Sequence, residues 1–191
     1  IIFIEELLHI SPDFPDALFY LGYCIQYLGN YRYAISCYER VINIFESNEN
    51  PNKLALISLE QSILKMLFCE LGRCYLALGN EKGLDYLERG LSISPLDSKI
   101  LLQLTRYYLV NGSLYKALTH HFKNNVMISE SSKQILLNKA SLPDSNQSYK
   151  EIEIEFLKGL DIVPGWLKEE KESITNRIIT IEKSLNTDNE A

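Results

Sequence analysis

A tripeptide that occurs twice constrains the fold of this chain more than any other feature of its sequence. Leu28-Gly29-Asn30 recurs as Leu78-Gly79-Asn80, and Asn111-Gly112-Ser113 is a weaker third copy. Glycine adopts the left-handed conformation that ends helices at little steric cost, so each copy predicts a tight turn after a helix. Recurrence of this kind indicates a chain built from units that stack on one another.

Each turn is predicted to join two helices. The helix before the turn carries Leu-Gly or its counterpart near its middle, at Leu21-Gly22, Leu71-Gly72 and Leu104-Thr105. The helix after the turn carries a small residue, at Ala34, Gly83 and Ala117. Small residues let the two helices approach closely, and larger ones then fill the space between units. Pro12 and Pro95 cannot continue a helix interior and therefore mark the start of a new unit.

These residues resemble the tetratricopeptide repeat, whose signature is W-x2-L-G-x2-Y, then A-x3-F, then P, with a period of about 34. The first copy reads Leu18-x2-Leu21-Gly22-x2-Ile25 and Ala34-x3-Tyr38. The second reads Phe68-x2-Leu71-Gly72-x2-Tyr75, Gly83-x3-Leu87 and Pro95. The third reads Leu101-x2-Leu104-Thr105-x2-Tyr108 and Ala117-x3-His121. The resemblance implies an all-α fold, a right-handed α-α superhelix of tetratricopeptide-like repeats with a C-terminal helical hairpin cap.

The repeat signature divides the chain at about residue 125. Residues 1–125 form the predicted repeats, and residues 126–191 form the C-terminal helical extension or cap. The parts of the array are 1–13 (second helix of a partial repeat), 14–47 (repeat one), 48–64 (insertion and helix extension), 65–95 (repeat two) and 96–125 (repeat three).

Two departures from the repeat stand out. About 16 residues are inserted between repeats one and two, with a strong turn signal at 47–52 and then one long predicted helix over 54–78. In repeat three, Thr105 replaces the small glycine and His121 replaces an apolar residue, which predicts looser packing there.

Three further helices are predicted after residue 125, at about 129–141, 147–160 and 165–185, with a break at Val163-Pro164-Gly165. The last two carry apolar stripes and charged outer faces, as a cap of a solenoid does. A docking face for a partner helix is the alternative. The acidic side chains Glu151, Glu153 and Glu155 are interpreted as a solvated helix face.

The sequence contains no motif that predicts catalysis. It has no G-x-S-x-G turn, no H-E-x-x-H and no glycine-rich phosphate loop. His120 and His121 are adjacent on a predicted helix and would point about 100° apart, so they do not predict a shared metal site. The four cysteines lie in apolar helical stretches without metal-ligand spacing, which predicts buried thiols in a reducing, cytoplasmic compartment. We therefore expect a protein that is not an enzyme and has no cofactor and no metal.

The charge distribution narrows the class of partner. The chain has 19 basic and 25 acidic side chains, a net charge of −6, which argues against a nucleic-acid surface. No apolar run reaches the roughly 20 residues that span a bilayer, so no membrane insertion is expected.

In the tetratricopeptide family the first helix of each repeat lines a concave groove that takes extended peptides or partner helices. Carried over by position, the resemblance implies the following groove residues: Phe19, Tyr23, Gln26 and Tyr27 from repeat one; Met66, Cys69, Arg73 and Leu76 from repeat two; Lys99, Leu102, Arg106 and Leu109 from repeat three. Arg73, Arg106 and Lys99 would be its cationic points, which predicts a protein or peptide partner with acidic or C-terminal carboxylate groups. The alternative is that some of these residues pack on the C-terminal helices, folded back into the groove.

The sequence therefore predicts a non-catalytic protein–protein interaction scaffold that binds a peptide or partner helix in this groove. Two alternatives remain open. One is the regulatory or substrate-docking arm of a larger enzyme whose catalytic domain is outside this chain. The other is a homo-oligomeric structural spacer, joined through the last helix or through the helix that follows the insertion.

Overall fold

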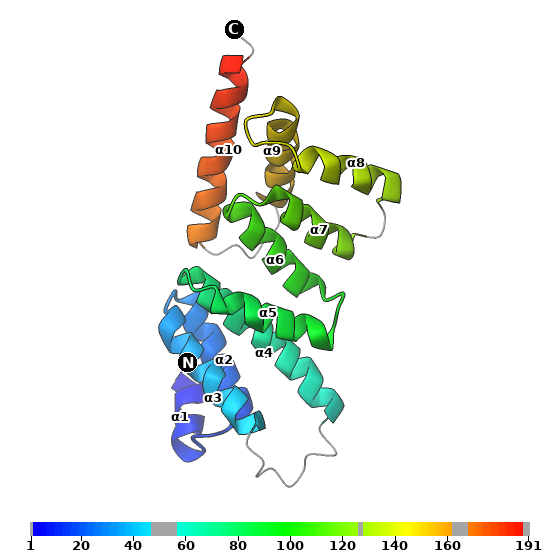
Figure 1. Cartoon of the computed structure of the whole chain (residues 1–191). Helices are drawn as coiled ribbons and strands as arrows, with labels where there is room; N and C mark the ends of the chain where they lie inside the picture. The colour runs from blue at the N-terminus through cyan, green and yellow to red at the C-terminus, as the bar shows by residue number, and fades with distance from the viewer. Residues whose placement is uncertain (1, 47–56, 126–127, 162–167, 189–191) are drawn as a thin grey trace. The chain divides into compact units, whose positions relative to one another are not determined.

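The computed structural model describes residues 2–46, 57–125, 128–161 and 168–188. Every regular element in these ranges is an α-helix, which confirms the all-α class. In chain order (Figure 1) they are α1 (Ile2–Ile10), α2 (Pro15–Tyr27), α3 (Tyr31–Glu46), α4 (Ile57–Ala77), α5 (Lys82–Ile93), α6 (Ser98–Val110), α7 (Leu114–Asn124), α8 (Glu130–Ala140), α9 (Gln147–Asp161) and α10 (Lys168–Asp188).

The helix boundaries agree closely with those predicted from the sequence. The long helix expected over 54–78 is α4, and the three helices expected after residue 125 are α8, α9 and α10. The turn predicted at 47–52 and the break predicted at 163–165 lie outside the described residues.

The chain forms two compact units, unit 1 (Ile1–Ile100) and unit 2 (Leu101–Ala191). The division falls inside α6, whereas the repeat signature ends near residue 125, between α7 and α8. In unit 2, α7 packs on α8, α8 on α9 and α9 on α10. The helices that follow the last repeat thus continue the stack of α7 without interruption.

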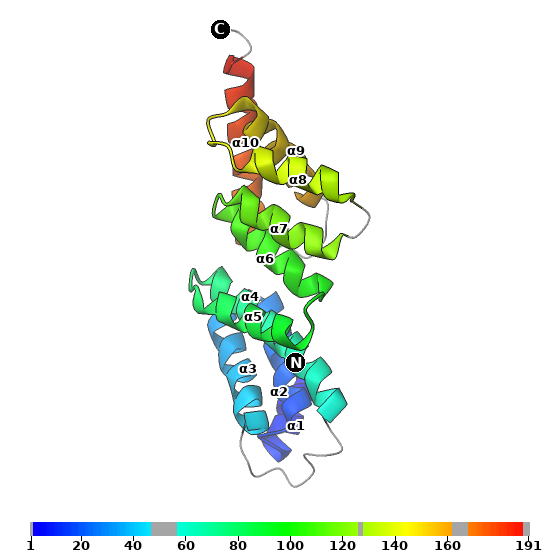
Figure 2. The same ribbon diagram turned by 45° about the vertical axis from the view of Figure 1, so that its right-hand side comes forward.

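In unit 1 each helix packs on the next one along the chain, from α1 to α5, and α2 also touches α4 (Figure 2). Its core is made of apolar side chains from α2 to α5. The fully buried members are Leu18, Ala34, Tyr38, Val41, Leu67, Leu71 and Cys74. They include the positions that the repeat signature assigns to the packing between helices, such as Leu18, Ala34 and Leu71.

The three predicted turns have the same geometry. Gly29, Gly79 and Gly112 have φ of +80°, +70° and +70°, the left-handed conformation that the repeated tripeptide predicts. In each turn the N–H after the glycine donates to the carbonyl five residues earlier, which closes the end of the helix. These bonds are Asn30 to Ile25 (3.1 Å), Asn80 to Tyr75 (2.9 Å) and Ser113 to Tyr108 (2.7 Å).

The small residue of the first helix permits a close crossing in repeat one. A Cβ atom added to Gly22 would lie 2.7 Å from a ring carbon of Tyr38, inside van der Waals contact. In repeat three, Thr105 takes this place and is buried, and its hydroxyl donates to the Leu101 carbonyl at 2.8 Å. That internal hydrogen bond satisfies the hydroxyl without a water molecule, so Thr105 is accommodated in a closed helix contact and not in a loose one.

Candidate functional site

Three exposed tyrosines lie in a row on α2. Tyr20, Tyr23 and Tyr27 are 58%, 40% and 81% exposed, and their spacing of three and four residues places them on one helix face. Met66 of the neighbouring helix α4 is 41% exposed. We call these four residues the tyrosine face. The rings of Tyr23 and Tyr27 contact each other with centroids 5.8 Å apart.

A partly buried chain of hydrogen bonds lies beneath the tyrosine face and joins α3, α2 and α4. The Tyr38 hydroxyl donates to Gln26 Oε1 (2.8 Å), and Gln26 Nε2 donates to Glu70 Oε2 (2.9 Å). Arg73 Nη1 donates to the same Glu70 oxygen at 2.9 Å, forming an ion pair within α4. Burial raises the pKa of Tyr38 far above its usual range, so its hydroxyl remains a donor. This chain fixes the spacing of α2 and α4.

The same chain sets the electrostatics of the tyrosine face. Burial, and then the negative charge of Glu70, raise the pKa of Tyr23. The Arg73 side chain is only 15% exposed, and its positive charge is balanced by the ion pair with Glu70. The face is therefore aromatic and close to neutral, with Arg73 held at its edge.

The structure divides the twelve residues expected in a groove into three groups. Tyr23, Tyr27, Met66 and Lys99 are exposed, and Arg73, Leu76 and Leu102 are partly buried. The others are buried: Phe19, Gln26, Cys69, Arg106 and Leu109. A helix with neighbours on two sides buries more than half of its circumference, so only a narrow stripe remains open. The five buried side chains are packed against protein and do not form part of an open surface.

Tyr20 belongs to the open stripe, although the position-by-position comparison with the repeat did not select it. Its spacing from Tyr23 and Tyr27 along the helix was the available signal, because residues three, four and seven apart share a face.

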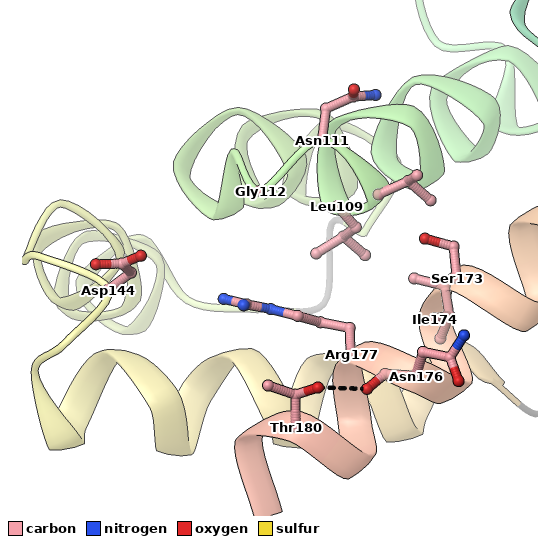
Figure 3. Close-up of a pocket in the computed structure, with 10 residues that line it drawn as sticks. Leu109, Asn111, Gly112, Asp144, Ser173, Ile174, Asn176, Arg177 and Thr180 are labelled. Atoms are coloured by element: carbon pink, nitrogen blue, oxygen red, sulfur yellow. Dashed lines mark hydrogen bonds between the residues drawn. The ribbon is translucent and has the colours of Figure 1, made fainter. Parts of the chain in front are cut away.

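Unit 2 contains a pocket of about 530 Å³ between the α6–α7 turn, Asp144 and α10 (Figure 3). Arg177 extends from α10 toward Asp144. Leu109 and Ile174 form an apolar part of the pocket wall. The guanidinium group is already engaged, because its Nε and Nη2 donate to the two Glu153 oxygens at 2.8 Å each. The pocket thus offers mainly hydroxyl and amide groups, from Asn111, Ser173, Asn176 and Thr180.

The environment of the buried cysteines is unsuited to nucleophilic chemistry. Cys37, Cys69 and Cys74 are buried free thiols, and Cys24 is partly buried. Burial raises the pKa of Cys69 and of Cys74 to about 12, so neither is a thiolate near neutral pH.

His120 and His121 have different neighbours, the ring of Tyr108 and the ring of Phe156 respectively. In the described ranges, no three side chains of His, Cys, Asp or Glu gather closely enough to hold a metal ion. None of the described helices has the combination of length and apolar character that a membrane crossing requires.

Comparison with known proteins assigns no relative to this chain. No model of a protein family matches it, and no curated protein matches its sequence.

Proposed function

We propose that this chain is a non-catalytic scaffold of tetratricopeptide-like helical hairpins, arranged as a right-handed superhelix, that binds a segment of a partner protein on the tyrosine face of unit 1. The repeated turn geometry and the packing of α1 to α5 in chain order support the likeness to this family. The four cysteines are free, which is in keeping with a reducing, cytoplasmic location.

The observation that carries the proposal is the exposure of Tyr20, Tyr23, Tyr27 and Met66 on a rigid support. Exposed aromatic and apolar groups that lie together mark interaction surfaces on soluble proteins. Tyrosine also provides a large contact area at a small entropic cost, since it has few rotatable bonds. The hydrogen bonds from Tyr38 to Arg73 hold α2 and α4 in place before a partner arrives, which lowers the cost of binding.

The partner chemistry follows from the charges at this surface. The sequence favoured acidic groups, with Arg73, Arg106 and Lys99 as cationic points. Arg73 is paired with Glu70 and Arg106 is buried. Lys99 is exposed but belongs to α6 and not to the tyrosine face, so this face favours apolar and aromatic side chains of a partner over acidic ones.

Peptides selected on the wild-type protein from a random display library test this proposal. Binding of the selected peptides is measured by calorimetry to Tyr23→Ala/Tyr27→Ala and to Tyr33→Ala. Tyr33 is a matched control, because it is 45% exposed on α3 and outside the tyrosine face. We expect the double variant to lose about tenfold or more in affinity, as aromatic anchors at the centre of interfaces do. Equal losses in both variants, or no loss in the double variant, would contradict the proposal.

A second candidate, self-association, rests on α1. None of its residues is buried, and Ile2, Phe3 and Ile10 are 71%, 85% and 82% exposed. If a helix of a second copy packs on this apolar face of α1, the face is removed from water. Sedimentation of the wild type and of Phe3→Glu/Ile10→Glu distinguishes the two. A concentration-dependent dimer that the double variant abolishes supports self-association, and a strict monomer at tens of micromolar contradicts it.

A further inference from the structure

Three basic side chains occupy one face of α7 in unit 2. Lys116, His120 and Lys123 are spaced by four and three residues, which places them on neighbouring turns of the same face. Lys116 and Lys123 are exposed, and His120 is partly buried. In the described part of the chain no carboxylate forms an ion pair with either lysine. This is a local positive cluster in a protein whose net charge is −6.

An aromatic ring organises the cluster from α6. The ring of Tyr108 stacks on His120 with centroids 5.4 Å apart and planes 6° from parallel. Lys116 Nζ lies 5.2 Å from the centroid of the same ring. Tyr108 thus holds the imidazole and one ammonium group near each other at a single point of the surface.

Two features of this cluster have no explanation in helix stability. Lys116 is in the first turn of α7, the positive end of the helix dipole, where a cation is unfavourable. The Nδ1 atom of His120 is buried and has no hydrogen-bond partner among the described residues. A buried polar atom without a partner is a cost to the folded protein, so the stability of the fold does not explain this placement of the imidazole. Of the three residues, only Lys123 has a position that helix stability explains, because a cation in the last turn interacts favourably with the helix dipole.

We propose that Lys116, His120 and Lys123 bind a phosphate group carried by a phosphorylated segment of a partner protein. The two lysine charges match a phosphate dianion better than a single carboxylate, and the imidazole adds a third polar group for its three acceptor oxygens. The N-terminal end of the helix dipole adds to the attraction near Lys116. Basic surfaces that recognise anionic membranes contain about four to eight Lys or Arg residues, more than this cluster has.

Protonation of His120 is linked to binding and provides a direct readout. Burial, and then the charges of Lys123 and Lys116, hold the pKa of His120 below its ordinary value. Tyr108 is the group that faces it from α6. A bound phosphate places negative charge beside the ring and reverses the effect of the two lysines. His121 is an internal control on the same helix, because burial alone lowers its pKa.

The first experiment is a titration of the histidine Hε1 resonances by NMR in inorganic phosphate and in chloride at equal ionic strength. We expect phosphate to raise the pKa of His120 by about one unit and to leave that of His121 unchanged. Lys116→Glu/Lys123→Glu should abolish this change. The matched control is Lys139→Glu/Lys183→Glu, which reverses two exposed lysines on α8 and α10 and should retain it. A His120 pKa that is the same in both salts, or an equal change in all histidines, would overturn the proposal.

The second experiment identifies the source of the phosphate. Calorimetry compares a glycine-rich peptide with one phosphoserine, the same peptide without the phosphate, and inorganic phosphate. We expect the phosphopeptide to bind at least as tightly as inorganic phosphate, and Lys116→Glu/Lys123→Glu to weaken it about tenfold. An unphosphorylated peptide that binds equally well would overturn the proposal, and so would sedimentation with phosphatidylserine vesicles without phosphopeptide binding. These variants leave the tyrosine face intact, so failure here and failure of the proposed function are distinguishable.

Discussion

Gly72 of α4 and Gly83 of α5 face each other where the two helices cross. A Cβ atom on Gly83 would lie 2.5 Å from the Gly72 carbonyl oxygen, and one on Gly72 would lie 2.9 Å from the Gly83 carbonyl oxygen. Each glycine therefore leaves room for the backbone of the other, and a side chain on either would push the two helices apart.

Substitution at this contact should destabilise unit 1. Gly72→Leu is expected to lower the free energy of unfolding by about 1 to 3 kcal/mol or more, because backbone atoms are harder to displace than flexible side chains. Gly83→Ala should act in the same direction. Urea denaturation followed by circular dichroism measures the change.

Gly159 is the matched control for these variants. It is an exposed residue of α9, and a Cβ there would meet nothing within 4 Å. Gly159→Ala should leave stability unchanged or raise it by up to about 1 kcal/mol, since alanine favours the helix. A Gly72→Leu protein as stable as the wild type would show that α4 and α5 cross elsewhere.

Local signals in the sequence were sufficient for the helices and the turns. The positive φ of Gly29, Gly79 and Gly112 follows from one residue type at one place, and so does the end of each helix. Such features depend on a few neighbouring residues, which a single sequence contains in full.

The open surface could not be predicted in the same way. Gln26 and Arg73 were expected to line a groove, yet Gln26 is buried and both bind Glu70. Glu153 was expected on a solvated helix face with Glu151 and Glu155, yet it is 1% exposed and bound to Arg177. These pairings depend on how distant helices are rotated against each other, and no local pattern records that rotation.

The hydrogen bonds of Gln26 should contribute to the stability of unit 1. Gln26→Leu leaves the Tyr38 hydroxyl, which is fully buried, without its acceptor and removes a donor from Glu70. An unsatisfied buried polar group costs about 1 to 3 kcal/mol, and urea denaturation should detect a loss of this size.

The Gln26 prediction has two internal checks. Gln147→Leu removes an exposed hydrogen bond to Glu151 and should change stability by no more than about 0.5 kcal/mol. Tyr38→Phe combined with Gln26→Leu should cost less than the two single changes added together, because it removes both partners. Strict additivity would mean that the bond contributes nothing.

The ion pair between α9 and α10 should be far more important than its exposed neighbour. Arg177→Met leaves the Glu153 carboxylate buried without its bidentate partner, which should cost about 2 to 4 kcal/mol. The range is reduced because the Arg177 side chain is 39% exposed. Lys158→Met breaks an exposed pair with Glu182 on the same two helices and should cost less than about 1 kcal/mol.

A compensating variant separates the buried charge from the lost contact. Glu153→Leu/Arg177→Met replaces both charges with apolar groups and should recover much of the stability lost by Arg177→Met alone. If the two variants are equally unstable, packing and not the buried charge is responsible.

His121 should make unit 2 sensitive to acid. Its ring packs nearly perpendicular to the ring of Phe156, with centroids 4.8 Å apart, in a groove that includes Leu118 and Ile152. Burial lowers the pKa of His121 below its ordinary value of 6.5, so the unfolded chain takes up the proton more readily than the folded one. The stability that depends on neutral His121 is complete above about pH 6.5 and falls as the pH decreases toward the lowered pKa.

Urea denaturation at about pH 7.5 and about pH 5 should therefore show a smaller loss for His121→Phe than for the wild type. The exposed His9 of α1 is the matched position, and His9→Phe should keep the acid sensitivity of the wild type. An equal loss in His121→Phe and in the wild type would assign the acid sensitivity to other groups.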